Sequence, residues 1–524
     1  MNEESRANEL RSFSIWPLLP IFGWSLWLFH PLLQAHFGLI DDHELVLWFG
    51  HDGQLSLGGA WKILRESEIF NPQSTARFRP IYYGSRILEA WFWGASPHLW
   101  YLGRIFVHAV LIFSIFRFLS ALFPFRTLIG VFAFYCSLDY FWIDIVCRLG
   151  PAELYAAAFL ATMLFGLTSL IDNRSDLGCV AIAVGFGLIS GTKENMIFLA
   201  AVPALVIFWR WKSLSRTAVA ALGFSIVFGM AMFIRALVVV SGGGEDVYGR
   251  EVSGNKVARL ATALFAEYPL YALGEVFAGV ILAACFLIRR FRPTLVQPRH
   301  LQLISRLSLL FLGMGYVAVS QYVFYQGDWP NQSNSIRYDF PGVLIIQALG
   351  FIAFCLVLKF SLVIRYERVL MGFVLSVASL FLVATSWASI ETLRVAAFKV
   401  ARTTQRTSAA LDEINKYLSI DPSRRIVITV NSMFDYEPMF AIRSLLLAAG
   451  IKNPIAVEIV GFSSSNWKAQ DLAHSLVLQM EAIRDKGGQG FIPRSEITNE
   501  TGCLSIGLSG PPGKDCTDGV LVPY

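Results

Sequence analysis

Charged residues are scarce in this chain: Asp, Glu, Lys and Arg make up 15% of its 524 residues, against about a quarter in a soluble domain. Hydrophobic residues make up 55% and aromatic residues 14%. Apolar stretches near the ~20 residues that cross a bilayer recur from residue 14 to residue 390 and then stop. The composition therefore excludes a soluble globular protein. It predicts a membrane domain, 1–390, and a polar tail, 391–524.

Metal-ligating side chains are also few in the tail. Cys503 and Cys516 are its two cysteines and His474 is its one histidine, which is too few for a structural zinc site with four ligands. The remaining cysteines fall in or beside apolar stretches, where we expect buried small hydrophobes: Cys136, Cys147, Cys179, Cys285 and Cys355. The net charge of +5 does not predict nucleic-acid binding, because the basic residues fall mainly between apolar stretches.

The apolar stretches predict an all-α polytopic domain with about eleven transmembrane helices. The predicted spans are 14–36, 100–123, 128–146, 152–171, 178–190, 196–209, 218–240, 270–287, 304–324, 343–358 and 370–387. The first follows Arg6 and Arg11 but has no small-residue cleavage site after it, so we interpret it as a retained span and not as a signal peptide.

Basic residues concentrate in alternate connections, as the positive-inside rule requires of cytoplasmic loops. That set is Arg6, Arg11, Arg117, Arg126, Arg174, Arg210, Lys212, Arg216, Arg289, Arg290, Arg292, Arg299, Arg306, Lys359, Arg365 and Arg368. The opposite short loops hold Arg148, Lys193 and Arg337. We therefore predict a cytoplasmic N-terminus and an exported tail. Within the tail, strands at 425–430 and 455–460 and helices at 439–449 and 469–484 indicate a small α/β extracytoplasmic domain.

The first outer loop, 37–96, is much longer than a connection requires. It opens with Asp41 and Asp42 at the expected membrane surface, and adjacent carboxylates repel unless a cation, a proton or a function offsets the cost. Arg79 and the aromatic stretch 87–93 follow, a composition typical of helices that lie in the membrane interface.

An acidic pair after the first span, a long first outer loop, about eleven spans and an exported tail together resemble the C-type glycosyltransferase superfamily (GT-C). The resemblance covers the architecture of the whole chain, while the matching motifs are short. It implies a polyprenyl-phosphate sugar as donor and an acid of the first-loop pair as general base. By position these acids are Asp41, our first choice, and Asp42.

The leaving phosphate of such a donor needs cations or a divalent metal beside it. The candidate phosphate-binding residues are Arg79, Lys193, Arg235 and Arg337, with Arg148 as a further cation of the outer loops. A Mg²⁺ or Mn²⁺ ion would take Asp42 as a ligand. Arg235 lies inside the seventh span, where an isolated charge is costly, so we expect it to face a polar cavity.

Acids of the outer loops are candidates for a second acid near the acceptor: Asp144, Glu153 and Glu194. Asp144 is also spaced to pair with Arg148 at i, i+4 on a helix. Asp139 has no partner evident from the sequence.

The function expected is that of a membrane glycosyltransferase that moves a sugar to a glycan, lipid or protein acceptor, with membrane lipids around it, in the inner membrane of a bacterium. A transporter or flippase of lipid-linked sugars is one alternative, although no internal repeat supports it. A non-catalytic assembly subunit is a second. An oligosaccharide polymerase or ligase is a third, and it would use arginines and a histidine.

We predict that Cys503 and Cys516 form a disulfide, because both lie in a domain expected to be exported to an oxidising compartment. The short loop they close would give a stabilisation of about 2–4 kcal/mol. Thiol labelling of the denatured, unreduced protein should leave both positions unmodified. Labelling of both would show that they are not bonded.

Overall fold

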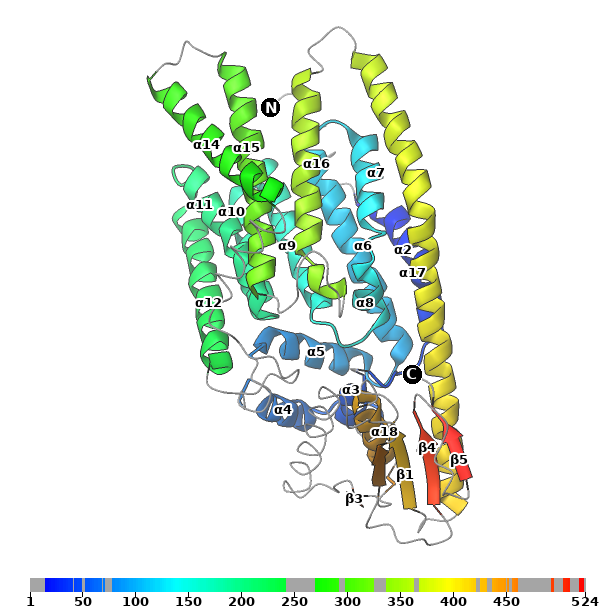
Figure 1. Cartoon of the computed structure of the whole chain (residues 1–524). Coiled ribbons are helices and arrows are strands. Elements are labelled where there is room, and N and C mark those ends of the chain that lie inside the picture. The colour runs from blue at the N-terminus through cyan, green and yellow to red at the C-terminus, as the bar shows by residue number, and fades with distance from the viewer. Residues whose placement is uncertain are drawn as a thin grey trace.

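A computed structural model describes most of the membrane domain and part of the tail. The described residues are 15–40, 42–49, 52–67, 69–70, 78–241, 269–291, 297–324, 336–361, 367–420, 425–430, 436–448, 450–451, 455–459, 492–493, 503–508 and 518–522. They form a helical bundle with a small parallel sheet at one of its ends (Figure 1). We call this end the sheet end. Asp41 and Cys516 lie outside the described residues.

Six described helices are long and apolar enough to cross a membrane, so the chain is a multi-pass membrane protein. They are α6 (Pro97–Leu122), α9 (Glu153–Ile171), α12 (Arg216–Ser241), α14 (Pro269–Phe291), α15 (Pro298–Phe324) and α16 (Gly342–Ser361). The predicted count of about eleven is not confirmed. Three of the other predicted spans correspond to shorter helices: α2 (Leu18–Phe29), α10 (Ser175–Ser190) and α11 (Ala201–Arg210), which follows the 3₁₀ helix η3 (Glu194–Ala200).

The predicted single span 128–146 is instead broken into two helices. α7 (Arg126–Cys136) and α8 (Phe141–Cys147) meet at an angle of 69°. A break frees backbone carbonyls that must find partners in an apolar bundle. The Trp142 indole donates to the Cys136 carbonyl at 2.9 Å, and the His108 ring donates to the Ser137 carbonyl at 3.3 Å. Trp24 also donates to the Ser137 hydroxyl at 3.0 Å, so side chains from three other positions stabilise the break.

Close contact between α9 and α10 depends on glycines. A Cβ at Gly166 would lie 2.7 Å from the Gly178 carbonyl oxygen and 2.8 Å from the Ile182 nitrogen. A Cβ at Gly178 would in turn lie 2.7 Å from the Gly166 oxygen. Small residues of this kind let two membrane helices approach to backbone contact.

The long first loop covers the sheet end of the bundle. It contains α3 (His43–Trp48), α4 (Leu57–Glu66) and α5 (Pro80–Trp93), and α4 and α5 lie across the ends of the spans (Figure 1). Trp61 on α4 and Trp91 and Phe92 on α5 are exposed, which suits helices in the plane of a membrane interface. The end of α14, the start of α15, the end of α16 and the start of α17 lie at the opposite end (Figure 1).

The tail forms a five-stranded, all-parallel sheet in the order β3-β2-β1-β4-β5. Its elements are β1 (Arg425–Val430), α18 (Tyr436–Ala448), β2 (Ile455–Ile459), β3 (Ile492–Pro493), β4 (Cys503–Gly507) and β5 (Asp518–Leu521). The predicted strands 425–430 and 455–460 and helix 439–449 therefore appear as β1, β2 and α18. The predicted helix 469–484 lies outside the described residues.

One helix, α17 (Glu367–Ile420), extends from the bundle into the tail. The predicted domain boundary at residue 390 falls inside it. Ile414 and Leu418 of α17 pack in the core of the sheet domain, together with Leu39 of the first loop. Two further bonds hold the segment before the first loop to α17: the His36 N–H donates to Thr404 Oγ1 at 3.0 Å, and the Gln405 side chain donates to the Gln34 carbonyl at 2.9 Å.

We expect Gly166→Ala to lower the free energy of unfolding by about 1–3 kcal/mol, the usual cost of overpacking, because the new methyl group would meet backbone atoms of α10. Gly223→Ala on α12 is the control, since a Cβ there has no atom within 4 Å. Thermal unfolding in detergent measures both. Equal melting temperatures for the two variants would contradict the close packing of α9 on α10.

Candidate site at the sheet end of the bundle

Asp42 is the described member of the first-loop acidic pair. It directly precedes α3, and its side chain is buried, with 3% of the residue exposed. Its Oδ2 accepts a hydrogen bond from the Gly38 N–H at 2.6 Å. This bond closes the turn that leads from the first helix into the loop. Asp42 thus has a structural task in addition to its predicted chemical one.

The helix α5 is fastened to the bundle through Arg86, which is 1% exposed. Its guanidinium donates to Glu44 Oε2 at 2.7 Å and to the Tyr82 hydroxyl at 2.8 Å. Tyr82 donates in turn to the Gly150 carbonyl at 2.8 Å. This chain of bonds connects α3, α5 and the α8–α9 loop.

A second buried arginine also holds the α8–α9 loop in place. Arg104 on α6 donates to Glu89 Oε1 at 3.0 Å and to the Arg148 carbonyl at 2.9 Å. The Tyr155 hydroxyl donates to the other oxygen of Glu89 at 2.5 Å. Arg86, Glu89 and Arg104 are not among the residues predicted from the sequence. A charge four residues after Tyr82 could have pointed to Arg86. A lone arginine within an apolar span could have pointed to Arg104.

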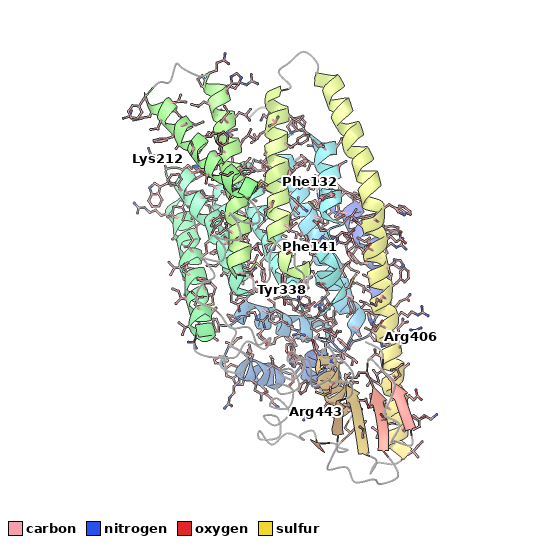
Figure 2. The ribbon with its side chains drawn as sticks, viewed as in Figure 1. Phe132, Phe141, Lys212, Tyr338, Arg406 and Arg443 are labelled. Atoms are coloured by element: carbon pink, nitrogen blue, oxygen red, sulfur yellow. The ribbon has the colours of Figure 1, made fainter. Side chains whose placement is uncertain are left out.

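Four of the predicted site residues gather with Tyr338 into one group, which we call the Lys193 cluster: Asp144, Glu153, Lys193, Arg337 and Tyr338. Lys193 forms an ion pair with Glu153 at 2.5 Å, and the Glu153 side chain is 2% exposed. The Lys193 ammonium also lies 4.3 Å from the centre of the Tyr338 ring, a cation–π distance. Tyr338 lies where the spans meet the first-loop helices (Figure 2).

The remaining members of the cluster join through η4 (Ile336–Asp339). The Arg337 guanidinium lies 5.3 Å from the Tyr338 ring centre, and the Arg337 backbone N–H donates to Asp144 Oδ2 at 3.4 Å. Asp144 and Arg148 form the predicted i, i+4 pair at 4.0 Å. The cluster therefore draws residues from α8, α9, the α10–η3 connection and η4 into one place.

Electrostatics in this region follow from burial and from the two cations. Burial lowers the pKa of Lys193, although Glu153 acts in the opposite direction. Burial alone would raise the pKa of Tyr338, but the charges of Lys193 and Arg337 outweigh it and the pKa is lowered. Burial raises the pKa of Asp339 to about 6. The environment of Tyr338 therefore favours negative charge.

The other two predicted phosphate-binding residues, Arg79 and Arg235, each contact an aromatic residue of the first loop. Arg79 precedes α5, with its guanidinium 5.1 Å from the Tyr82 ring centre, and the Ile81 N–H donates to the Gly191 carbonyl at 3.0 Å, two residues from Lys193. Arg235 is exposed on α12, with its guanidinium 5.9 Å from the ring centre of Phe78. Phe78 is the neighbour of Arg79, so α12 also contributes a cation to this side.

Some residues discussed in the sequence analysis lie apart from the cluster or outside the described residues. Glu194 begins η3 and is half-buried. Asp139 lies at the α7–α8 break and accepts a hydrogen bond from Gln347 at 3.3 Å, a partner that the sequence does not indicate. Cys503 begins β4, but Cys516 is not described, so the disulfide stays a prediction. The membrane-domain cysteines are buried and unbonded, as expected.

A metal ion at Asp42 remains a prediction as well. Within the described part of the chain, no three His, Cys, Asp or Glu side chains come together. Asp42 directs one oxygen at the Gly38 N–H, whereas Mg²⁺ takes one or two carboxylates together with waters and substrate phosphates. The described residues thus supply one candidate ligand.

We predict that Lys193→Met lowers the free energy of unfolding by about 3–5 kcal/mol, because the buried Glu153 carboxylate loses its counter-ion. The double variant Lys193→Met, Glu153→Gln should recover much of this loss, since no charge is left unpaired. Lys212→Met at the opposite end is the control, as Lys212 is exposed (Figure 2). Thermal unfolding in detergent gives all three values. A single variant as stable as the double variant would contradict the buried ion pair.

Comparisons with known proteins identify no family for this chain. No protein-family model matches the sequence, and no curated protein matches it. The geometry of the sheet end therefore carries the functional conclusion, and the architectural resemblance remains an expectation.

Proposed function

We propose that this chain is an integral membrane glycosyltransferase that moves a sugar from a polyprenyl-phosphate carrier to a glycan, lipid or protein acceptor on the outer face of a membrane. The observation that carries the proposal is the Lys193 cluster, where Lys193 and Arg337 meet around Tyr338 at the sheet end. The proposal includes an eleven-span arrangement of the GT-C type, with the sheet end in the periplasm of a bacterium and the N-terminus in the cytoplasm.

The first support is the match between these cations and the leaving group of the reaction. When the bond from the anomeric carbon to the carrier breaks, the phosphate gains negative charge. Fixed cations in a water-poor site stabilise such charge far better than water does. Lys193 and Arg337 are partly buried beside a tyrosine whose pKa they lower, so the site already favours an anion. Arg79 and Arg235 would hold the phosphate from α5 and α12.

The second support is access from the membrane plane. A polyprenyl carrier keeps its chain in the lipid and brings its phosphate to the interface. The α4 and α5 helices expose Trp61, Trp91 and Phe92 and cover the ends of the spans at this level (Figure 1). Exposed aromatic residues of this kind anchor a protein surface in the headgroup region.

The chemical step needs a base for the attacking hydroxyl of the acceptor. In the proposed mechanism, Asp41 takes that proton as the new bond forms at the anomeric carbon, and the carrier phosphate leaves toward the cations. Asp42 holds the turn beside Asp41 through the Gly38 N–H. Glu153 keeps Lys193 charged and in place. Asp144 and Glu194 are the proposed acids on the acceptor side.

The test is transfer activity of Asp41→Asn in proteoliposomes that contain polyprenyl-phosphate glucose, mannose, galactose or arabinose. Asparagine preserves the shape of the side chain but removes its basicity, so turnover should fall by ~10²-fold or more while carrier binding survives. Asp42→Asn should have a smaller effect on turnover. Asp52→Asn is the matched control, since Asp52 is an exposed acid in the same loop.

Three outcomes would change the conclusion. If Asp42→Asn abolishes transfer while Asp41→Asn is nearly normal, the assignment within the pair is reversed and the reaction class stands. If both single variants and the double variant keep transferring sugar, the acidic pair is not the general base and the GT-C mechanism fails. If the wild type transfers no sugar from any of these carriers, the glycosyltransferase proposal fails. A transporter or an assembly subunit would then take its place.

A further inference from the structure

Two amide side chains beside the Lys193 cluster are buried, and the described residues offer them no hydrogen-bond partner. Asn195 is 2% exposed and Gln321 is 1% exposed. Both the nitrogen and the oxygen of each side chain lack a partner within the part of the chain that the structure describes. Leaving such a group buried and unsatisfied costs about 1–3 kcal/mol, and native structures keep few of them without a reason.

Both amides lie close to the cluster in the fold. Asn195 follows Lys193 by two residues in η3. Gln321 packs on the start of α16, because a Cβ at Gly342 would lie 2.4 Å from Gln321 Cγ and 3.4 Å from its Nε2. Gly342 itself follows Tyr338 by four residues. Each amide is thus connected to the cluster: Asn195 through Lys193, and Gln321 through the start of α16, which follows Tyr338.

Asn195 and Gln321 also lie at a similar depth in the bundle. The Tyr316 hydroxyl of α15 donates to the Phe198 carbonyl of η3 at 2.9 Å, which ties these two elements together. Gln321 lies further along α15 toward the sheet end, by about 7.5 Å at 1.5 Å per residue. Asn195 lies about 6 Å from Phe198 toward the same end at the 3₁₀ rise of 2.0 Å. The two amides are therefore at nearly the same level.

The hydrogen-bonding groups of the two amides indicate which kind of ligand fits between them. An amide offers two donors and one accepting oxygen. An ionised phosphate only accepts and would leave both amide oxygens unsatisfied, while a metal ion would leave both amide nitrogens unsatisfied. A hydroxyl group both donates and accepts. A molecule with several hydroxyls close together can satisfy all four atoms.

We infer that Asn195 and Gln321 bind the hydroxyl groups of the donor sugar, next to the cations that hold its phosphate. This inference rests on the proposed function and names the residues that recognise the sugar. Asn195 reaches the sugar from η3 and Gln321 from α15. A site whose buried amides stay unsatisfied without the right hydroxyls rejects a ligand that lacks them, so the pair sets the specificity for the sugar.

The experiment compares carrier binding by wild type, Asn195→Leu and Gln321→Met in lipid nanodiscs. The probes are bare polyprenyl phosphate and the same carrier with glucose, mannose, galactose or arabinose. We expect the wild type to bind at least one sugar-bearing carrier more tightly than the bare carrier. Each variant should lose about tenfold of that preference and keep its affinity for the bare carrier within about twofold.

Thermal unfolding without ligand provides a second readout. Removing an unsatisfied buried amide should leave stability equal or higher. Gln347→Met is the matched control, because the Gln347 amide donates to Asp139 at 3.3 Å and its loss should destabilise the fold. Variants of Asn195 and Gln321 as unstable as Gln347→Met would show that water already satisfies the amides, which overturns the inference.

The binding results separate the two levels of the proposal. If the variants keep the full preference for a sugar-bearing carrier, or the wild type shows none, the amides do not read the sugar, although bare-carrier binding would still support the phosphate site. If the wild type binds no carrier, the proposed function fails together with the inference.

Discussion

The ion pair between Lys193 and Glu153 is the interaction on which the sheet end of the bundle depends. Removing two charges from water costs several kcal/mol per ion, and the attraction between them repays this only with good geometry and further polar contacts. Here Tyr338 adds a cation–π contact to Lys193, and the charge of Arg337 favours the ionised Glu153 carboxylate. The start of α9, the α10–η3 connection and η4 must therefore stay together, because separating any of them would leave a charge buried without compensation.

Charges inside or beside apolar stretches made part of this site predictable from the sequence. The need for cations beside a leaving phosphate pointed to Lys193 and Arg337, and the search for a second acid in the outer loops pointed to Glu153. The structure brings all three together. The i, i+4 spacing of Asp144 and Arg148 predicted their pairing, which is confirmed at 4.0 Å. Period and composition likewise predicted strands β1 and β2 and the helix α18. These features depend on residues that are close together in the sequence, so a local sequence pattern is enough to predict them.

Features that depend on distant partners could not be predicted in this way. The α7–α8 break is stabilised by Trp24 and His108, which lie 113 and 29 residues away from Ser137. Arg86 and Arg104 were not predicted as site residues, yet both are buried in bonds to other elements. Neutral amides such as Asn195 give even less signal, since they can lie at the end of any apolar stretch without a penalty that the sequence reveals.

The attachment of Leu39 to the core of the sheet domain has a consequence for how the chain is made. The segment that precedes the acidic pair pairs with residues far later in translation, since His36 and Gln34 bond to partners 368 and 371 residues away. At 5–20 residues per second, a ribosome needs roughly 20–75 s to cover that separation. During this interval the first loop is already at the membrane but lacks its packing partners. The anchoring of this segment is thus complete only late in synthesis, and a prematurely terminated chain would lack the partners of Gln34, His36 and Leu39.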